Sequence, residues 1–158
     1  MTNEIRLVQF FKLEDAAGGV HRFQNYFVGQ SKTFGGESYS FAPFQVQGNV
    51  SSLNGDNAQI QVLFPAIDYA IALVEAGEGN RRSRLNLSTR TVVNPTTQAI
   101  SDAGPQEIYI GLGASFSEDT IELRFNTAAD SVASNFPARR LNQDNVGFLP
   151  LESSLSLR

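Results

Sequence analysis

The sequence predicts a mainly β domain, a β-barrel or sandwich, with one short α-helix and an extended C-terminal arm. Several segments alternate apolar and polar residues with a period of two, which is typical of strands with one buried face. Only one segment has the apolar spacing of an amphipathic helix. The segment 135–158 loses all periodicity but keeps several large apolar side chains. We therefore divide the chain into a β domain at 1–134 and an assembly arm at 135–158.

The N-terminal part of the chain predicts two hairpins. Residues 4–13 form the first expected strand, and a glycine-containing turn reverses the chain into a strand at 20–23. Residues 33–39 predict the second hairpin, because their central Gly-Gly pair supplies the positive φ angles of a tight two-residue turn. Pro43 interrupts the pattern and is expected at a strand start or edge, since proline cannot donate a ladder hydrogen bond.

The middle of the chain predicts a strand followed by the helix. A segment rich in turn-forming residues at 53–57 precedes the strand at 59–64, which alternates apolar and polar residues cleanly. The helix is expected from about Ala66 to Ala76, with Gly77 placed to end it. Its apolar stripe has the i, i+3, i+4, i+7 spacing and consists of Ile67, Ala70, Ile71 and Val74.

Strands return after the helix. In the first of them Leu85, Leu87, Thr89, Thr91 and Val93 alternate with polar residues. Two more strands are expected at 107–112 and 120–125. About seven to nine strands with one helix between them are typical of a barrel or sandwich.

Composition excludes several kinds of function. The chain has no cysteine and a single histidine, His21, which excludes a disulfide framework, a thiolate metal site and a site of several histidines. The formal net charge of −4 lacks the basic stripe of a general nucleic-acid binder. No apolar run reaches the ~20 residues of a membrane span, and the N-terminus lacks signal-peptide features. We expect no enzymatic activity, no cofactor and no metal.

Four short patterns have residue types found in functional sites, but turns, strands and surface positions explain them better. His21 would need an orienting carboxylate and a nucleophile, which the sequence does not reveal, so a surface or interface histidine is expected. Glu118 and Asp119 are expected as turn residues rather than as a glycosidase pair. Residues 54–57 lack the Glu of a calcium loop. The Gly-Leu-Gly segment at 111–113 opens no helix and is not a dinucleotide site.

Two groups of arginines predict contact surfaces. Arg81, Arg82, Arg84 and Arg90 form one cluster, and Arg139 with Arg140 a second. Contact with phosphate and pairing with acidic groups of an adjacent subunit both remain open, and the acidity of the chain favours subunit pairing. The expected interface residues are Arg81, Arg82, Arg84, Phe136, Pro137, Arg139, Arg140, Phe148, Leu149 and Leu151.

The turn chemistry of residues 28–64 carries a family resemblance. The matching features are Val28-Gly29-Gln30, Phe34 to Tyr39, Pro43, Gly48 and Leu53-Asn54-Gly55. This segment resembles the N-terminal domain of the lambda-type minor tail protein L and related phage proteins of the tail tip and baseplate hub. Residues 107–112 and 120–125 are similar to that domain's last strands, and Phe136 to Arg140 to its closing Phe-Pro-Gly-Arg element. The resemblance covers roughly two thirds of the chain, in order.

The resemblance implies a tail-tube-like β domain at the distal end of a phage tail. Such a protein would be a tube initiator, distal tail ring or hub adaptor that joins the tail tube to the hub or baseplate and lines the DNA channel. Its implied partners are its own copies in a trimeric or hexameric ring, the tail tube protein, hub or baseplate proteins, and passing genomic DNA without sequence-specific binding. The implied location is the virion tail, after synthesis in the host cytoplasm. The family's cysteine-bound cluster is not carried over, because this chain has no cysteine.

Two other classes of function remain open. The chain could be a monomeric β-sandwich carbohydrate-binding module of a tail fibre. The absence of tryptophan weakens this interpretation, while four tyrosines keep it open. A small tail-associated hydrolase is the weakest alternative, because no acid–base constellation is evident.

Overall fold

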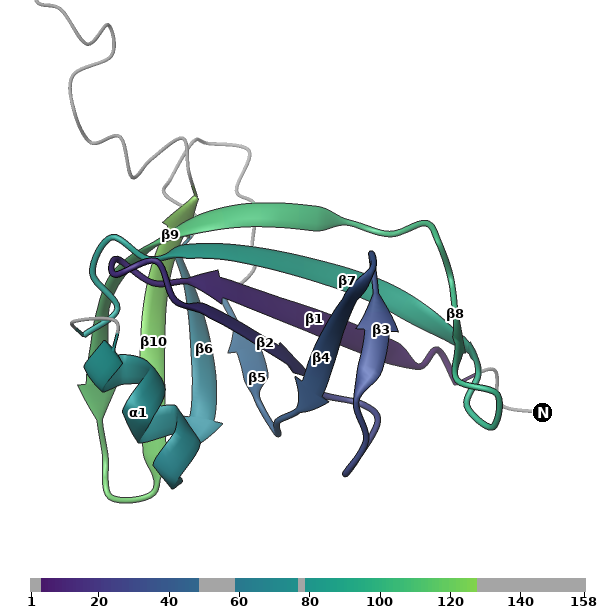
Figure 1. The fold of residues 1–158 in the computed structure, drawn as a ribbon, viewed down its shortest axis with the longest axis horizontal. Coiled ribbons are helices and arrows are strands. Elements are labelled where there is room, and N and C mark those ends of the chain that lie inside the picture. The colour runs from purple at the N-terminus through teal and green to yellow at the C-terminus, as the bar shows by residue number, and fades with distance from the viewer. Residues whose placement is uncertain (1–3, 49–58, 77–78, 128–158) are drawn as a thin grey trace, which may run out of the picture.

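The computed structural model describes residues 4–48, 59–76 and 79–127, so the predicted arm at 135–158 lies outside the described residues. The described part contains ten strands and one helix (Figure 1). In chain order they are β1 (Leu7–Glu14), β2 (Val20–Gln24), β3 (Lys32–Phe34), β4 (Glu37–Phe41), β5 (Gln45–Gln47), β6 (Gln59–Pro65), α1 (Asp68–Ala76), β7 (Arg84–Asn94), β8 (Ala99–Ile100), β9 (Gln106–Phe116) and β10 (Thr120–Thr127). The prediction of a mainly β domain with one short helix is confirmed.

The strands belong to one mixed sheet with the order β3-β4-β2-β1-β7-β9-β10-β6-β5, and β8 pairs with β7. Every pairing is antiparallel except β2 with β4. In Figure 1, β1, β7 and β9 run across the view while β6 and β10 run steeply beside α1, so the sheet is strongly bent. The sheet is nevertheless open. The expected closure into a barrel is wrong, because the short strands β3 and β5 end the path without pairing to each other.

Both faces of the sheet are covered near β1. Phe11 belongs to the main core, which lies on the side of β6, β10 and α1. Its neighbour Phe10 belongs to a second core, under the β3–β4 hairpin, together with Val8, Tyr39 and Val92. Because successive side chains of a strand point to opposite faces, a strand covered on both sides buries adjacent residues. This explains why the first strand mixes alternation with adjacent apolar residues.

The predicted hairpins are confirmed. β1 pairs with β2 from Phe10 to Glu14, and β3 pairs with β4 across a turn at Gly35 and Gly36. These glycines have φ angles of 58° and 80°, as the tight turn requires. The strand predicted at 59–64 is β6, in which Ile60, Val62 and Phe64 are buried as expected.

Two predicted faces are wrong. Helix α1 buries Ala70, Leu73 and Val74, whereas Ile67 and Ile71 of the predicted stripe are 41% and 36% exposed. The packed face is rotated because Leu73, rather than Ile67, meets the core. β7 buries Leu85 and Leu87 in the main core but then turns Ser88, Arg90 and Val92 inward on the opposite face. The second half of β7 therefore packs on the second core, to which Val92 belongs. The alternating residues from Leu85 to Val93 do not form one buried face.

Candidate functional site

The first candidate surface is the turn between α1 and β7. Arg81, Arg82 and Arg84, which we call the arginine corner, are all exposed and form no ion pair with any other described residue. Arg82 has a φ of 60°, a left-handed conformation that a non-glycine residue adopts only at a cost. The structure therefore brings together the three arginines that the sequence predicted as one interface group.

Hydrogen bonds of the buried Asn80 and Ser83, which we call the buried lock, hold this corner on the sheet. Asn80 is 2% exposed, and its Nδ2 donates to the Gly113 carbonyl at 3.3 Å and to the Arg124 carbonyl at 3.2 Å. The buried Ser83 hydroxyl donates to the Asn80 carbonyl at 3.1 Å. The Gly111 N–H donates to the Ser83 carbonyl at 2.7 Å. The turn is therefore fixed to β9 by hydrogen bonds that water does not reach.

Gly111 makes this close approach feasible. A Cβ atom at position 111 would collide with the Asn80 carbonyl oxygen and the Ser83 hydroxyl, whereas one at Gly113 would meet only Arg124 at 3.7 Å. Both glycines lie inside β9, where the ladder to β10 shifts register between Arg124 and Phe125. Their role is backbone packing, in keeping with rejection of a dinucleotide site.

Arg90 does not belong to the corner. It is 7% exposed, and its Nη1 donates to the carbonyls of Thr89 and Pro105 at 2.9 and 3.1 Å. Its guanidinium lies over the Phe34 ring, 5.0 Å from the ring centroid. Grouping Arg90 with the other arginines is therefore wrong, because β7 turns this side chain into the second core.

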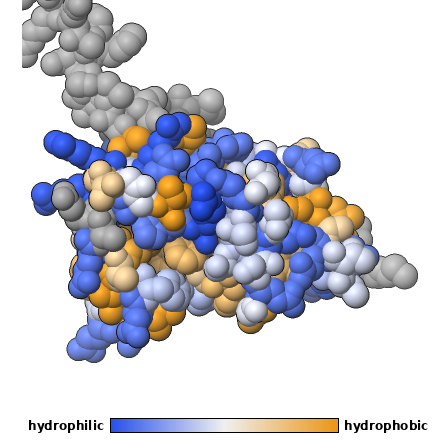
Figure 2. All heavy atoms as spheres, in the orientation of Figure 1, coloured by the Kyte–Doolittle hydropathy of each residue, from blue (hydrophilic) through white to orange (hydrophobic). Residues whose placement is uncertain are grey.

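Next to the corner, β9 exposes apolar side chains on its outer face. Ile108 and Leu112 are 38% and 42% exposed. Between them, half-buried Ile110 lies in register with Arg84 of β7 and Asn126 of β10. On the face seen in Figure 2, hydrophobic side chains form separate patches among polar ones. Such a mixture is ordinary for a protein surface, so only the row of apolar residues on β9 makes this face a candidate surface.

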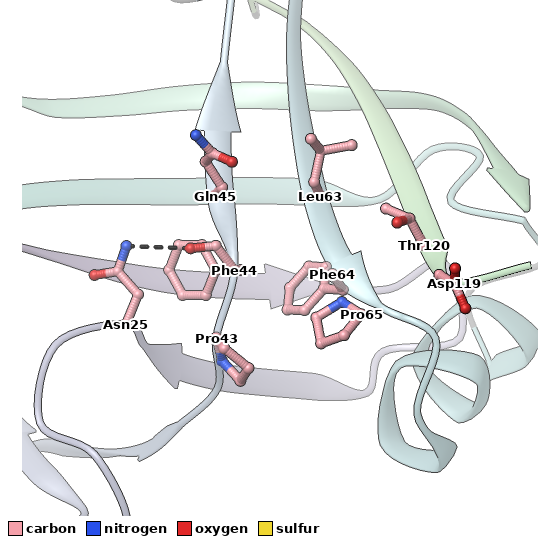
Figure 3. Close-up of a pocket in the computed structure, with 9 residues that line it drawn as sticks. All are labelled: Asn25, Pro43, Phe44, Gln45, Leu63, Phe64, Pro65, Asp119 and Thr120. Atoms are coloured by element: carbon pink, nitrogen blue, oxygen red, sulfur yellow. Dashed lines mark hydrogen bonds between the residues drawn. The ribbon is translucent and has the colours of Figure 1, made fainter. Parts of the chain in front are cut away.

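A second candidate surface is a groove where β5 and β6 separate. The groove has a volume of about 480 Å³ and lies between the chain around Phe44 and that around Phe64 (Figure 3). Its lining consists of Asn25, Pro43, Phe44, Gln45, Leu63, Phe64, Pro65, Asp119 and Thr120. The β5–β6 ladder stops at Gln45 and Leu63, just before the two prolines. Because proline cannot extend a ladder, the strands diverge here.

One acidic residue lines the groove and two more lie near it in the chain or at the adjoining helix start. Asp119 lines it, Glu118 precedes Asp119 in the tight turn before β10, and the Ala66 N–H donates to the Asp119 carbonyl at 2.9 Å. Asp68 begins α1 two residues after Ala66. None of these three carboxylates forms an ion pair within the described ranges. The prediction that Glu118 and Asp119 are turn residues is confirmed.

A third hollow, of about 240 Å³, lies beside the β3–β4 hairpin. On its wall Glu37 accepts hydrogen bonds from Lys12 Nζ at 2.8 Å and from Arg22 Nη2 at 2.9 Å. Lys12 first, and Arg22 second, lower the pKa of Glu37 to about 2. Of the two aromatic residues that line this hollow, Phe34 and Tyr39, the first stacks on Phe10 with ring centroids 4.3 Å apart. The cluster therefore fastens the hairpin to β1 and β2.

This ion pair gives a pH prediction. A carboxyl whose pKa falls from 4.5 to about 2 on folding stabilises the fold fully above pH 4.5 and loses that effect as pH falls towards 2. We expect Glu37→Gln to lower the urea midpoint at neutral pH, and the gap from wild type to narrow between pH 4.5 and 2. The control is Glu75→Gln, an exposed change on α1. Parallel wild-type and Glu37→Gln curves across that range would contradict the assignment.

His21 has a partner that the sequence did not reveal. Its Nε2 lies 3.0 Å from Oδ2 of Asp15, whose side chain is only 3% exposed. Asp15 Oδ1 also accepts the backbone N–H groups of Ala17 at 3.0 Å and Gly19 at 2.7 Å. The hydrogen bond from His21 is the main cause of the lowered pKa of Asp15. The pair fixes the β1–β2 turn. The His21 side chain is 27% exposed, which agrees with the expected surface or interface position, but it has an orienting carboxylate that the sequence did not reveal.

The remaining predicted sites cannot be placed. Phe136, Pro137, Arg139, Arg140, Phe148, Leu149 and Leu151 all lie outside the described residues, as does the loop at 54–57. Within the described ranges no group of three or more acidic or histidine side chains is arranged to hold a metal. The described helix is too short to cross a membrane.

No protein-family model and no curated protein sequence matches the chain.

Proposed function

We propose that this chain is a structural component of the distal phage tail: a tube initiator, distal tail ring or hub adaptor. Copies of it form a ring that joins the tail tube to the hub or baseplate and lines the DNA channel. The proposal starts from the resemblance of residues 28–64 to the lambda-type tail-tip family. The turn chemistry behind that resemblance builds the β3–β4 hairpin, which covers the second core.

The observation that carries the proposal furthest is the uncovered outer face of β9. Ile108 and Leu112 are exposed there, close to the arginine corner. An apolar stripe with charges beside it suits a neighbouring subunit, which would cover the apolar atoms and pair the charges. The net charge of −4 suits a channel through which DNA slides without adhering. The partners are copies of the chain, the tail tube protein and hub or baseplate proteins, in the virion tail.

Assembly of the full chain tests this function. At high protein concentration we expect light scattering to report species larger than a monomer. Negative-stain images should then show annular particles of three or six copies with a central hole. A strict monomer, both alone and with its tail neighbours, would contradict the ring.

Removal of residues 136–158 gives a second test. Among the described residues, both cores are built from residues between Val8 and Phe125, so we expect the shortened chain to fold. We expect its far-UV spectrum to match that of the full chain while ring formation is lost, because the predicted arm carries seven of the expected interface residues. Unfolding of the shortened chain would show that the arm belongs to its own core.

A carbohydrate-binding module is the second candidate, and one observation favours it. Phe116 is 60% exposed beside a small hollow of about 90 Å³ that Ser115, Ser117, Thr120 and Glu122 also line. An exposed ring next to hydroxyl and carboxylate groups is the arrangement that stacks on a sugar. Binding of the monomer to a glycan array, lost in Phe116→Ala, would favour this function over the ring.

A further inference from the structure

We propose that the arginine corner of one subunit docks on the acid-ended groove of a second copy of this chain. The acid-ended groove is the hollow lined by β5, β6 and Asp119, together with Glu118, which precedes Asp119 in the chain, and Asp68 at the start of α1. This inference rests on the proposed ring and identifies the contact between neighbouring subunits. It joins two surfaces that stay unpaired within the described part of one chain.

The arginine corner, which donates the hydrogen bonds in this contact, is exposed and already held in place. All three guanidinium groups face solvent without a carboxylate partner among the described residues. The buried lock of Asn80 and Ser83 holds the turn on β9. Little conformational entropy of the backbone is therefore lost when this turn binds. Arginine suits the task because its planar fork pairs with a carboxylate and its flat face packs on apolar surface.

The acceptor surface has the matching chemistry. In Figure 3 Pro43 and Phe44 line one side of the groove and Phe64 and Pro65 the other, and Asp119 lies beyond Pro65, immediately before β10. The rings of Phe44 and Phe64 are buried and pack on each other, 5.6 Å between centroids, so the accessible apolar surface of these four residues is that of Pro43 and Pro65. A guanidinium would pack its flat face on these prolines and donate its N–H groups to the Asp119 carboxylate. The volume of about 480 Å³ accommodates side chains of arginine size.

The two surfaces belong at opposite ends of α1, so they cannot pair within one chain. Asp68 begins the helix, and the bond from Ala66 to Asp119 places the acidic turn at the same end. At the other end the Gly79 N–H donates to the Val74 carbonyl at 3.0 Å, just before the corner. A helix of nine residues separates its ends by about 13 Å, far beyond ion-pair reach. A closed ring of identical subunits needs two different, complementary surfaces of this kind.

Charge reversal with rescue tests the contact. One variant carries Arg81→Glu and Arg82→Glu, and the other carries Glu118→Lys and Asp119→Lys. We expect each variant alone to need at least about tenfold more protein for half-association in sedimentation velocity. An equimolar mixture should recover association, because every contact between unlike variants again joins opposite charges. The controls Arg6→Glu and Asp102→Lys carry the same signs elsewhere and should associate as the wild type does.

The outcomes separate the contact from the ring. Association of either variant alone at the wild-type concentration overturns the contact, while wild-type rings would leave the proposed function standing. Folded variants whose mixture fails to recover also overturn it. Charge-reversal variants that lower the melting temperature but not association would show that these charges stabilise α1 through its dipole. That result would also overturn the proposed contact. A wild type that stops at dimers would contradict the ring, whereas recovery of association in the mixture would still support the contact. A wild type that never associates overturns both.

Discussion

Replacing Phe11 with alanine is expected to lower the free energy of unfolding by about 3 to 5 kcal/mol. The side chain is fully buried, and its ring lies 5.4 Å from that of Phe64, 5.5 Å from that of Phe44 and 6.1 Å from that of Phe23. These rings come from β2, β6 and the segment before β5, so Phe11 joins distant parts of the bent sheet. Removing the ring loses buried apolar area and leaves a cavity. β1, β2, β6 and the segment before β5 cannot all move inward to fill this cavity, because the sheet holds each of them in place.

Chemical denaturation measures this effect, and Phe116→Ala is the matched control. Phe116 carries the same side chain but is 60% exposed, so the same substitution should change stability by no more than about 0.5 kcal/mol. A similar loss from both variants would mean that Phe11 is not the centre of the main core. A fall in the slope of the denaturation curve for Phe11→Ala would indicate a changed denatured state rather than a lost contact.

The sequence predicted strands of both kinds, but it identified the buried residues correctly only where one face of the strand is buried. β6 was predicted correctly because Ile60, Val62 and Phe64 all face one core. β7 was not, because its first half faces the main core and its second half, through Arg90 and Val92, faces the other. Periodicity describes one face at a time, so a strand that crosses from one core to another looks like a weaker alternating strand. The same crossing made Arg90 look like a member of the corner.

Of the two candidate surfaces, the sequence could predict one and not the other. The arginine corner could be predicted because its residues are adjacent in the sequence. The acid-ended groove could not, because its walls around Phe44 and Phe64 and its end at Asp119 come from three separate segments. Pro43 gave the signal that the sequence offered, since proline cannot donate a ladder hydrogen bond, whereas Pro65 still lies in register with Thr120 of β10. The partner of His21 was missed although it lies only six residues away, because turn geometry brings Asp15 to the ring.

The exposed apolar residues of β9 lie on the part of the outer sheet face that the β3–β4 hairpin does not cover. The β3–β4 hairpin covers the outer face of the sheet over Val8, Phe10 and Val92, but not over Ile108 and Leu112 of β9. The hairpin cannot extend further because β3 and its tight turn are short. In the proposed ring, a neighbouring subunit would cover the rest of the outer face. That partner would meet the arginine corner first, because the corner adjoins β9 in the sheet.

The prediction that links stability to assembly concerns Gly111. A methyl group at this position collides with a backbone oxygen, that of Asn80, which cannot move unless the turn moves. We expect Gly111→Ala to lower the free energy of unfolding by about 1 to 3 kcal/mol, the usual cost of overpacking. We also expect it to weaken association, because the arginine corner shifts with the turn. Denaturation and sedimentation velocity on the same preparation measure the two effects.

Gly113→Ala is the matched control for this variant. It lies two residues along the same strand, and a methyl group there meets only the Arg124 side chain at 3.7 Å, an ordinary contact. We expect its stability to equal or slightly exceed that of the wild type, since alanine restricts the unfolded chain more than glycine does. If Gly111→Ala lowers stability but leaves association intact, the corner does not depend on the lock for its position. If the two variants behave alike, the close approach of the turn to β9 is not a constraint on the fold.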